Sequence, residues 1–99
     1  MIIEVTTLNI QAGKNKAFEE AIHAAAEKFI ITYPGCLGYS IRHDIENILR
    51  YTIEIQWRTL EDHLENFRKS VTYTSWRSAI SPYFSEPPTT VHYAVIACS

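Results

Sequence analysis

Residues 49–57 alternate strictly between apolar and polar side chains, and no other pattern restricts the fold of this chain as strongly. The odd-numbered positions carry Leu, Tyr, Ile, Ile and Trp, and the even-numbered positions carry Arg, Thr, Glu and Gln. Successive side chains of a strand point to opposite faces of a sheet, so the segment predicts a strand with one buried and one polar face. Residues 37–44 alternate less regularly, and the turn-like stretch 44–47 predicts a β-hairpin.

A helix is predicted before the hairpin, between residues 14 and 33. Its apolar residues recur with the spacing of one helix face: Phe18, Ala21, Ile22, Ala25 and Phe29. Pro34-Gly35 predicts the end of this helix, because a proline disfavours helical backbone at the preceding residue and glycine suits the turn. The β-branched stretch 2–10 predicts a strand before the helix.

The helical region after the hairpin is predicted in two pieces. Thr59-Leu60-Glu61-Asp62 resembles a capping box with Asp in place of the usual Glu, and Leu60, Leu64 and Phe67 form the expected inward face. Helical spacing resumes after an offset at residues 73–84 and ends at the prolines that follow. Residues 89–97 predict a last strand.

The predicted order is β-α-β-β-α-β, in a single domain over residues 1–99. Right-handed crossovers arrange this order as an α+β, ferredoxin-like antiparallel sheet with both helices on one face. The uncovered face is expected to carry mainly polar side chains: Ser40, Arg42, Arg50, Thr52, Glu54 and Gln56. We expect a homodimer through this face, because a chain of 99 residues buries only a modest core by itself.

The composition disfavours several classes of protein. The formal net charge is −2, which disfavours nucleic-acid binding. RNA-binding modules share this order of elements, and Tyr51 could stack on a base, but the first strand has no aromatic residue. Cys36 and Cys98 form neither a disulfide framework nor a zinc motif. No apolar run reaches about 18 residues and no leader segment is apparent, so we expect no membrane segment and a cytoplasmic location.

Histidines are the first candidates for chemistry. His23, His43, His63 and His92 fall in different predicted elements without metal-ligand spacing, so no metal site is expected. His23 is expected in solvent, and His43 and His92 in structural or edge positions. His63 lies at the margin of the helix face that packs on the sheet, where it is either a helix-edge residue or a hydrogen-bond donor or base.

The opposing sheet face would present Tyr39, Tyr51, Ile53 and Trp57. These residues either fill the core or line an aromatic pocket. Glycines at 13, 35 and 38 form no phosphate-binding loop, and no serine or cysteine lies in a nucleophile motif.

Taken together, the segments resemble the antibiotic biosynthesis monooxygenase (ABM) family, small dimeric α+β barrels in which two ferredoxin-like sheets pack face to face. The resemblance covers nearly the full length. It rests on Gly13-Lys14 with Phe18, Tyr33-Pro34-Gly35-Cys36-Leu37-Gly38-Tyr39, Tyr51 through Glu54 to Trp57, Thr59-Leu60-Glu61-Asp62-His63, and Pro87-Pro88 leading into Val91-His92-Tyr93.

Some relatives oxygenate phenolic polyketides or quinols with dioxygen and no metal, flavin or haem. The resemblance therefore implies a small aromatic, phenolic or quinol-like substrate that is itself the reductant. As a phenolate it passes an electron to oxygen, and radical recombination gives a peroxide that collapses to a quinone. The protein would supply a dry aromatic pocket, hydrogen-bond donors and a base, without a cofactor.

The resemblance also implies roles for single residues. Trp57 matches a tryptophan that faces the pocket in such monooxygenases and would orient the substrate through its indole N–H. His63 stands where they carry a tyrosine, and would hydrogen-bond the substrate oxygen or abstract its proton. The other expected site residues are four walls and a partner for a developing anion: Tyr51, Ile53, Phe67 and Trp76, with Arg77 as the partner.

Two other functions are weighed beside this one. Haem-degrading relatives carry an asparagine, a tryptophan and a histidine where this chain has Thr6, Phe67 and Arg77, so the axial ligand is missing and haem degradation is not expected. Other relatives act on small carbonyl signalling molecules. A non-catalytic or isomerase-like dimer that binds a small metabolite is therefore the alternative.

Overall fold

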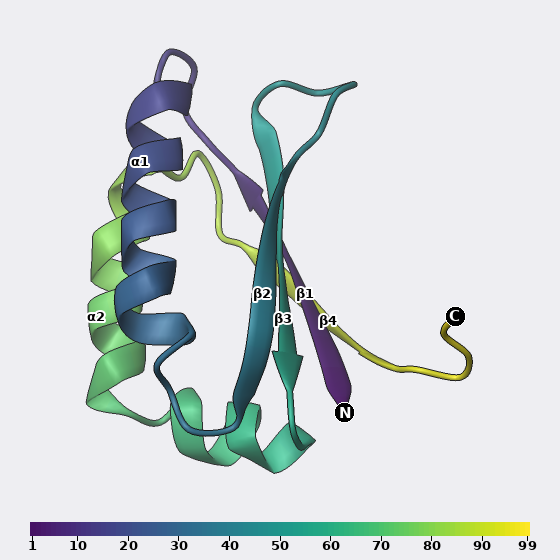
Figure 1. Cartoon of the computed structure of the whole chain (residues 1–99). Coiled ribbons are helices and arrows are strands. Elements are labelled where there is room, and N and C mark those ends of the chain that lie inside the picture. Colours follow the sequence, from purple (N-terminus) through teal and green to yellow (C-terminus); the bar gives the residue numbers. More distant parts are fainter.

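The computed structural model describes residues 1–99 and confirms the predicted α+β, ferredoxin-like fold (Figure 1). Four strands form one sheet, and two α-helices cover one of its faces. Three shorter helical segments follow α1, precede α2 and follow α2. The elements are β1 (Ile2–Asn9), α1 (Asn15–Ala25), η1 (Ala26–Ile30), β2 (Cys36–His43), β3 (Arg50–Trp57), η2 (Asp62–Phe67), α2 (Val71–Ile80), η3 (Ser81–Tyr83) and β4 (Thr89–Ala94).

The sheet is antiparallel throughout, with strand order β2-β3-β1-β4. β1 therefore lies in the interior of the sheet, and β4 forms one edge. In the register, Glu4 of β1 lies opposite Ile55 of β3 on one side and His92 of β4 on the other. Because residues directly opposite each other share a face, Glu4 and His92 both point toward the helices.

The alternation of β3 is confirmed. Tyr51, Ile53, Ile55 and Trp57 are buried between the sheet and the helices. The opposite face lies away from the helices and carries the polar positions predicted for it, together with Ile3, Val5, Val91 and Tyr93.

The first helix changes type before it ends. Phe18, Ile22 and Ala25 are buried as the spacing predicts, but the chain then becomes π-helical over Ala26–Ile30. In this segment the N–H of Ile31 donates to the carbonyl of Ala26, a bond that spans five residues. The longer turn moves the buried side by one position, so the next buried side chains are Ala26 and Ile30, and Phe29 is only partly covered.

The second helical region has the two predicted pieces, but its inward face differs from the prediction. Leu60 is 42% exposed, and the buried side chains of η2 are Asp62, His63 and Phe67. The predicted face assumed α-helical spacing, whereas η2 is π-helical, with the N–H of Arg68 donating to the carbonyl of His63. Thr59 does cap the helical turn that leads into η2, because its hydroxyl accepts the backbone N–H of Asp62.

Gly35 positions the start of η2. Its φ is 93°, and a Cβ at this position would lie 2.6 Å from the Asp62 Cγ atom. The Gly35 carbonyl accepts the N–H of Arg58 (2.8 Å), and the Arg58 guanidinium forms two hydrogen bonds with the Asp62 carboxylate (3.2 Å each). The β2 entry, the β3 exit and η2 are thus held together at one corner of the sheet.

The last strand is shorter than predicted. It ends at Ala94, and Val95 and Ile96 beyond it are exposed. None of the helices has the length and apolar character that a membrane crossing requires.

Candidate active site

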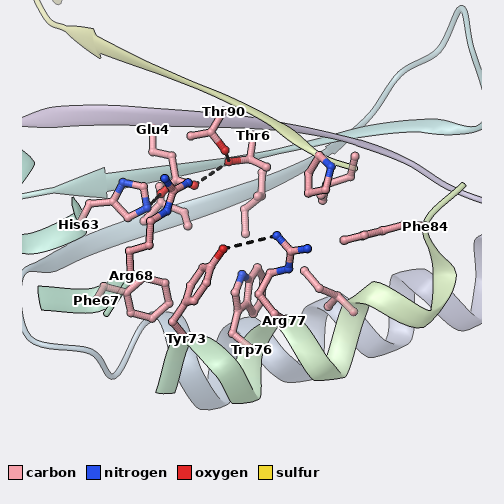
Figure 2. A pocket seen from close by; sticks show the side chains of 15 residues that line it. Glu4, Thr6, His63, Phe67, Arg68, Tyr73, Trp76, Arg77, Phe84 and Thr90 are labelled. Carbon is pink, nitrogen blue, oxygen red and sulfur yellow. Dashed lines mark hydrogen bonds and ion pairs between the residues drawn. The ribbon is translucent and has the colours of Figure 1, made fainter. Parts of the chain in front are cut away.

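A cavity of about 70 Å³ lies between the sheet and α2 (Figure 2). β1, β3 and the start of β4 supply one side, η2 and α2 supply the other, and the segment before β4 closes the end. The lining residues are Glu4, Thr6, Leu8, Ile53, Ile55, His63, Phe67, Arg68, Tyr73, Trp76, Arg77, Ile80, Phe84, Pro88 and Thr90.

Glu4 is a buried carboxylate on the sheet side of this cavity. One oxygen, Oε1, accepts the indole N–H of Trp57 at 2.8 Å and lies 3.2 Å from Nε2 of His63. The other oxygen, Oε2, accepts the hydroxyl of Thr6 at 2.6 Å. A carboxylate has about four lone-pair sites, so these three partners leave one acceptor site for a group in the cavity.

His63 is 2% exposed, and its ring is fixed on three sides. It stacks on the Trp57 indole with ring centroids 5.2 Å apart and an interplanar angle of 11°. Nε2 faces Glu4, and Nδ1 lies 2.7 Å from Nε2 of His92. Burial lowers the pKa of His63, against the raising effect of Glu4, and the charges of His92 and Arg68 lower it further. His63 is therefore neutral near pH 7.

The positions of the protons follow from this geometry. Nε2 of His63 lies 3.2 Å from Oε1 of Glu4, and the negative charge of an ionised carboxylate favours the tautomer whose proton is on this nitrogen. A neutral imidazole has one N–H, so Nδ1 of His63 is an acceptor and Nε2 of His92 must donate to it. His92 thus sets the tautomer of His63 that holds Glu4.

Aromatic rings and two guanidinium groups complete the lining. Phe67 and Tyr73 meet edge to face, with centroids 5.5 Å apart. Arg77 donates to the Tyr73 hydroxyl at 3.4 Å and lies 5.7 Å from the Phe84 ring centroid. No carboxylate lies within 4 Å of Arg68 or Arg77. The cavity therefore combines an acid–imidazole pair, aromatic walls and uncompensated positive charge.

The structure brings most of the predicted site residues together. His63, Ile53, Phe67, Trp76 and Arg77 all line the cavity.

Two of the predicted site residues lie outside the cavity lining. Trp57 lies behind Glu4, with its N–H directed to the carboxylate. Tyr51 lies toward the other end of β3, where its hydroxyl donates to Glu19 and its ring stacks on His43 at 4.2 Å. It borders a separate surface groove beside α1.

Sequence reasoning missed Glu4 and His92. The signal for Glu4 was present, because an acid at position 4 shares the inward phase of Leu8 and Ile10 in the first strand. An inward-facing charge in a strand that also buries Leu8 indicates a functional group, since burying a charge without partners is costly. His92 gave no such signal, because its contact with His63 depends on the tertiary arrangement of β4 and η2.

Comparisons with known proteins agree over most of the chain. The family described as "Antibiotic biosynthesis monooxygenase" (ABM) matches residues 1–79. The uncharacterized protein YczJ of Bacillus subtilis (strain 168) is 32% identical over 93 residues, covering 94% of this chain and 97% of that protein. A crystal structure from Bordetella bronchiseptica, provisionally named an antibiotic biosynthesis monooxygenase, is 30% identical and has a TM-score of 0.90, with 97% of each chain covered.

A structure from Nitrosomonas europaea with a similar provisional name shows a likeness of fold alone. It is 22% identical, with a TM-score of 0.80 and coverage of 98% of this chain and 100% of that chain.

Proposed function

Because this chain belongs to the antibiotic biosynthesis monooxygenase family, we propose that it oxidises a small phenolic or quinol-like compound with dioxygen in the cavity between the sheet and α2, without a bound cofactor. One observation carries the proposal: the buried Glu4–His63 pair borders an aromatic-lined cavity. Such a pair is suited to remove a phenolic proton, which makes the substrate a better electron donor to oxygen.

In the proposed reaction, Glu4 accepts the phenolic proton at its remaining lone-pair site. The phenolate then transfers one electron to dioxygen, and the resulting radicals combine through a new carbon–oxygen bond. The O–O bond then breaks and the C–H proton at the same carbon is lost, which gives a quinone; this proton and the one that Glu4 returns leave on the departing oxygen as water. One phenol and one dioxygen thus yield one quinone and one water, with no net proton change.

The neighbours of Glu4 have supporting roles in this proposal. His63 is the catalytic partner that spreads the charge of the acid, and Trp57 and Thr6 position the carboxylate through their hydrogen bonds. Phe67 and Trp76 are walls for the substrate ring. Ile53 and Arg77, which also line the cavity, keep their expected roles as a wall and as a partner for a developing anion.

The size of the cavity favours small substrates. Benzene fits a dry cavity of about 150 Å³. The cavity here has a volume of only about 70 Å³. A single aromatic ring therefore requires some movement of the lining. We expect one-ring hydroquinones and catechols to react faster than polycyclic phenols.

Oxygen uptake with product analysis tests the proposal. The panel runs from hydroquinones and catechols through naphthoquinols to polycyclic phenols, and heat-denatured protein controls for autoxidation. We expect uptake above that blank, reduced about 100-fold or more in Glu4→Gln and His63→Ala. Glu20→Gln, which replaces an exposed carboxylate on α1, is the matched control and should retain the rate. Uptake no faster than the blank across the panel would contradict the proposal.

The alternative is an isomerase-like or non-catalytic protein that binds a small metabolite. The polar part of the lining favours it: Thr6, Thr90, Arg68 and Arg77 offer hydrogen bonds that a plain hydrocarbon ring does not use. Ligand binding without oxygen uptake, found in a screen of small carbonyl compounds, would support this alternative.

We also propose a homodimer through the open sheet face. Its β1–β4 half is apolar, with Val5 opposite Val91 and Ile3 opposite Tyr93. Val91 and Tyr93 are 51% and 53% exposed in the single chain, and a partner would cover them. Light scattering at micromolar concentration should give a dimeric mass that Val91→Lys reduces. Val71→Lys, at an exposed helix position, is the control. A monomeric mass for the unmodified chain would refute the dimer.

A further inference from the structure

The five arginines of the chain divide into two groups. Arg42, Arg50 and Arg58 each form an ion pair with a carboxylate, at 3.4, 3.6 and 3.2 Å. Arg68 and Arg77 have no carboxylate within 4 Å, and both line the cavity. In a chain with a net charge of −2, the only unpaired guanidinium groups are therefore at the candidate active site.

Arg77 is held so that its charge remains available. It extends from α2 into the cavity, donates to the Tyr73 hydroxyl at 3.4 Å and lies over the Phe84 ring (Figure 2). Both contacts fix the direction of the guanidinium, but neither neutralises it. A guanidinium has five N–H donors, and one bond to a hydroxyl leaves most of them free for a planar acceptor.

The surroundings of the two arginines strengthen their effect on an anion. The walls between them are aromatic and aliphatic, and such walls concentrate the field of charges that line a cleft. The one acid of the lining, Glu4, hydrogen-bonds to Trp57 and Thr6 and faces His63, and its single negative charge leaves the pair of arginines with an excess of positive charge. The Tyr73 hydroxyl accepts a hydrogen bond from Arg77, so its own proton remains free to donate to an anion.

We propose that the substrate of this site is an anionic phenol, a small hydroxylated aromatic ring that carries a carboxylate. Arg77, assisted by Arg68, binds the carboxylate, and Glu4 faces the hydroxyl group that is deprotonated. Arginine pairs with carboxylates through two parallel N–H···O bonds, which fixes the orientation of the ring as well as its affinity. The proposal rests on the proposed function for the identity of the reacting hydroxyl, but the charge preference can be measured without turnover.

The test compares two probes that differ in charge and little in shape. 2,5-Dihydroxybenzoate and its neutral carboxamide are titrated into the protein by calorimetry under nitrogen, so that no oxidation occurs. We expect the benzoate to bind about tenfold or more tightly than the carboxamide, since hydrogen bonds to charged groups are the stronger ones. We also expect the difference to shrink as salt is added.

Variants identify the source of the preference. Arg77→Met keeps most of the side-chain length but removes the charge, and it should reduce the preference to within about twofold. Arg77→Lys keeps the charge and should retain part of the preference, which separates a charge effect from a general loss of structure. Arg50→Met removes a paired guanidinium outside the cavity and is the control that should leave both affinities unchanged.

Three results would overturn the inference: equal affinity for the two probes, tighter binding of the carboxamide, or no binding of either probe. Its failure is distinct from failure of the proposed function. Oxidation of neutral quinols without a charge preference would refute this inference but not the proposed function. Binding of the benzoate through Arg77 without oxygen uptake would refute the monooxygenase proposal but not this inference.

Discussion

Replacing Trp57 with phenylalanine should destabilise the protein mainly through the loss of one hydrogen bond. The Trp57 indole N–H donates to Oε1 of Glu4 at 2.8 Å, and both side chains are buried. A hydrogen bond to a charged group is worth about 1.5–3 kcal/mol, and the carboxylate that loses its donor stays buried. Trp57→Phe also removes part of an aromatic ring from the core, which adds a cost of its own.

Trp76→Phe separates these two costs. Trp76 is also buried and also lies in the core, but its indole N–H bonds no carboxylate. Both variants lose the same ring atoms, so the free energy of unfolding in urea at pH 7 should be lower in Trp57→Phe than in Trp76→Phe by about 1.5–3 kcal/mol.

A double-mutant cycle gives the decisive comparison. In a Glu4→Gln background the carboxylate charge is gone, so Trp57→Phe should cost about 1 kcal/mol less than it does in the unmodified protein. Additive costs in the cycle, or equal costs for the two tryptophan variants, would refute the reasoning that Trp57 positions Glu4.

Three further predictions concern the corner that holds the site. Burial lowers the pKa of His63 below 6.5, so the unfolded chain binds a proton at this residue more readily than the folded chain does. The free energy of unfolding should therefore fall as the pH decreases through 6.5. Urea titrations at several pH values should show a weaker dependence of this free energy on pH in His63→Gln. Nitrogen NMR of the imidazoles should show the proton of His63 on Nε2. His92→Leu should lower the population of this tautomer, and His92→Gln, which can still donate a hydrogen bond, should preserve it. An unchanged tautomer in His92→Leu would contradict the role of His92. Gly35→Ala should cost about 1–3 kcal/mol and more than Gly13→Ala, because both positions have positive φ but only Gly35 is in contact with Asp62; equal costs would show that the contact is unimportant.

The elements that sequence predicts well are those that depend on local periodicity. The alternation at residues 49–57 requires only that one sheet face be covered, and the face of Phe18 and Ile22 requires only a regular helix. The errors in the helices have one cause, which is that the apolar spacing assumed α-helical turns where the chain forms π-helical ones. At Asp62–Phe67 this change brings His63 inward and leaves Leu60 exposed.

Local periodicity also explains why only part of the site could be predicted from the sequence. His63, Phe67, Trp76 and Arg77 come from helical faces that the sequence displays, and they do meet at the cavity. The bond between His63 and His92 joins residues 29 positions apart in different elements, and it depends on the exact placement of η2 against β4. Trp57 lies on the buried face, as the alternation predicts. The direction of its N–H depends on Glu4, and the prediction from the sequence did not include Glu4 among the inward-facing residues.

The strand order also has a consequence during synthesis. β1 pairs with β3 and β4, and both strands are synthesised after it. The backbone N–H and C=O groups of β1 therefore have no strand partner until those later strands have been made. At about 5–20 residues per second, the 80 residues from Asn9 to Thr89 take about 4–16 s to translate. Throughout this interval at least one edge of β1 can pair with another nascent chain. The arrival of β4 closes that edge and brings His92 to His63, so the step that ends the risk of aggregation also completes the hydrogen-bonded site.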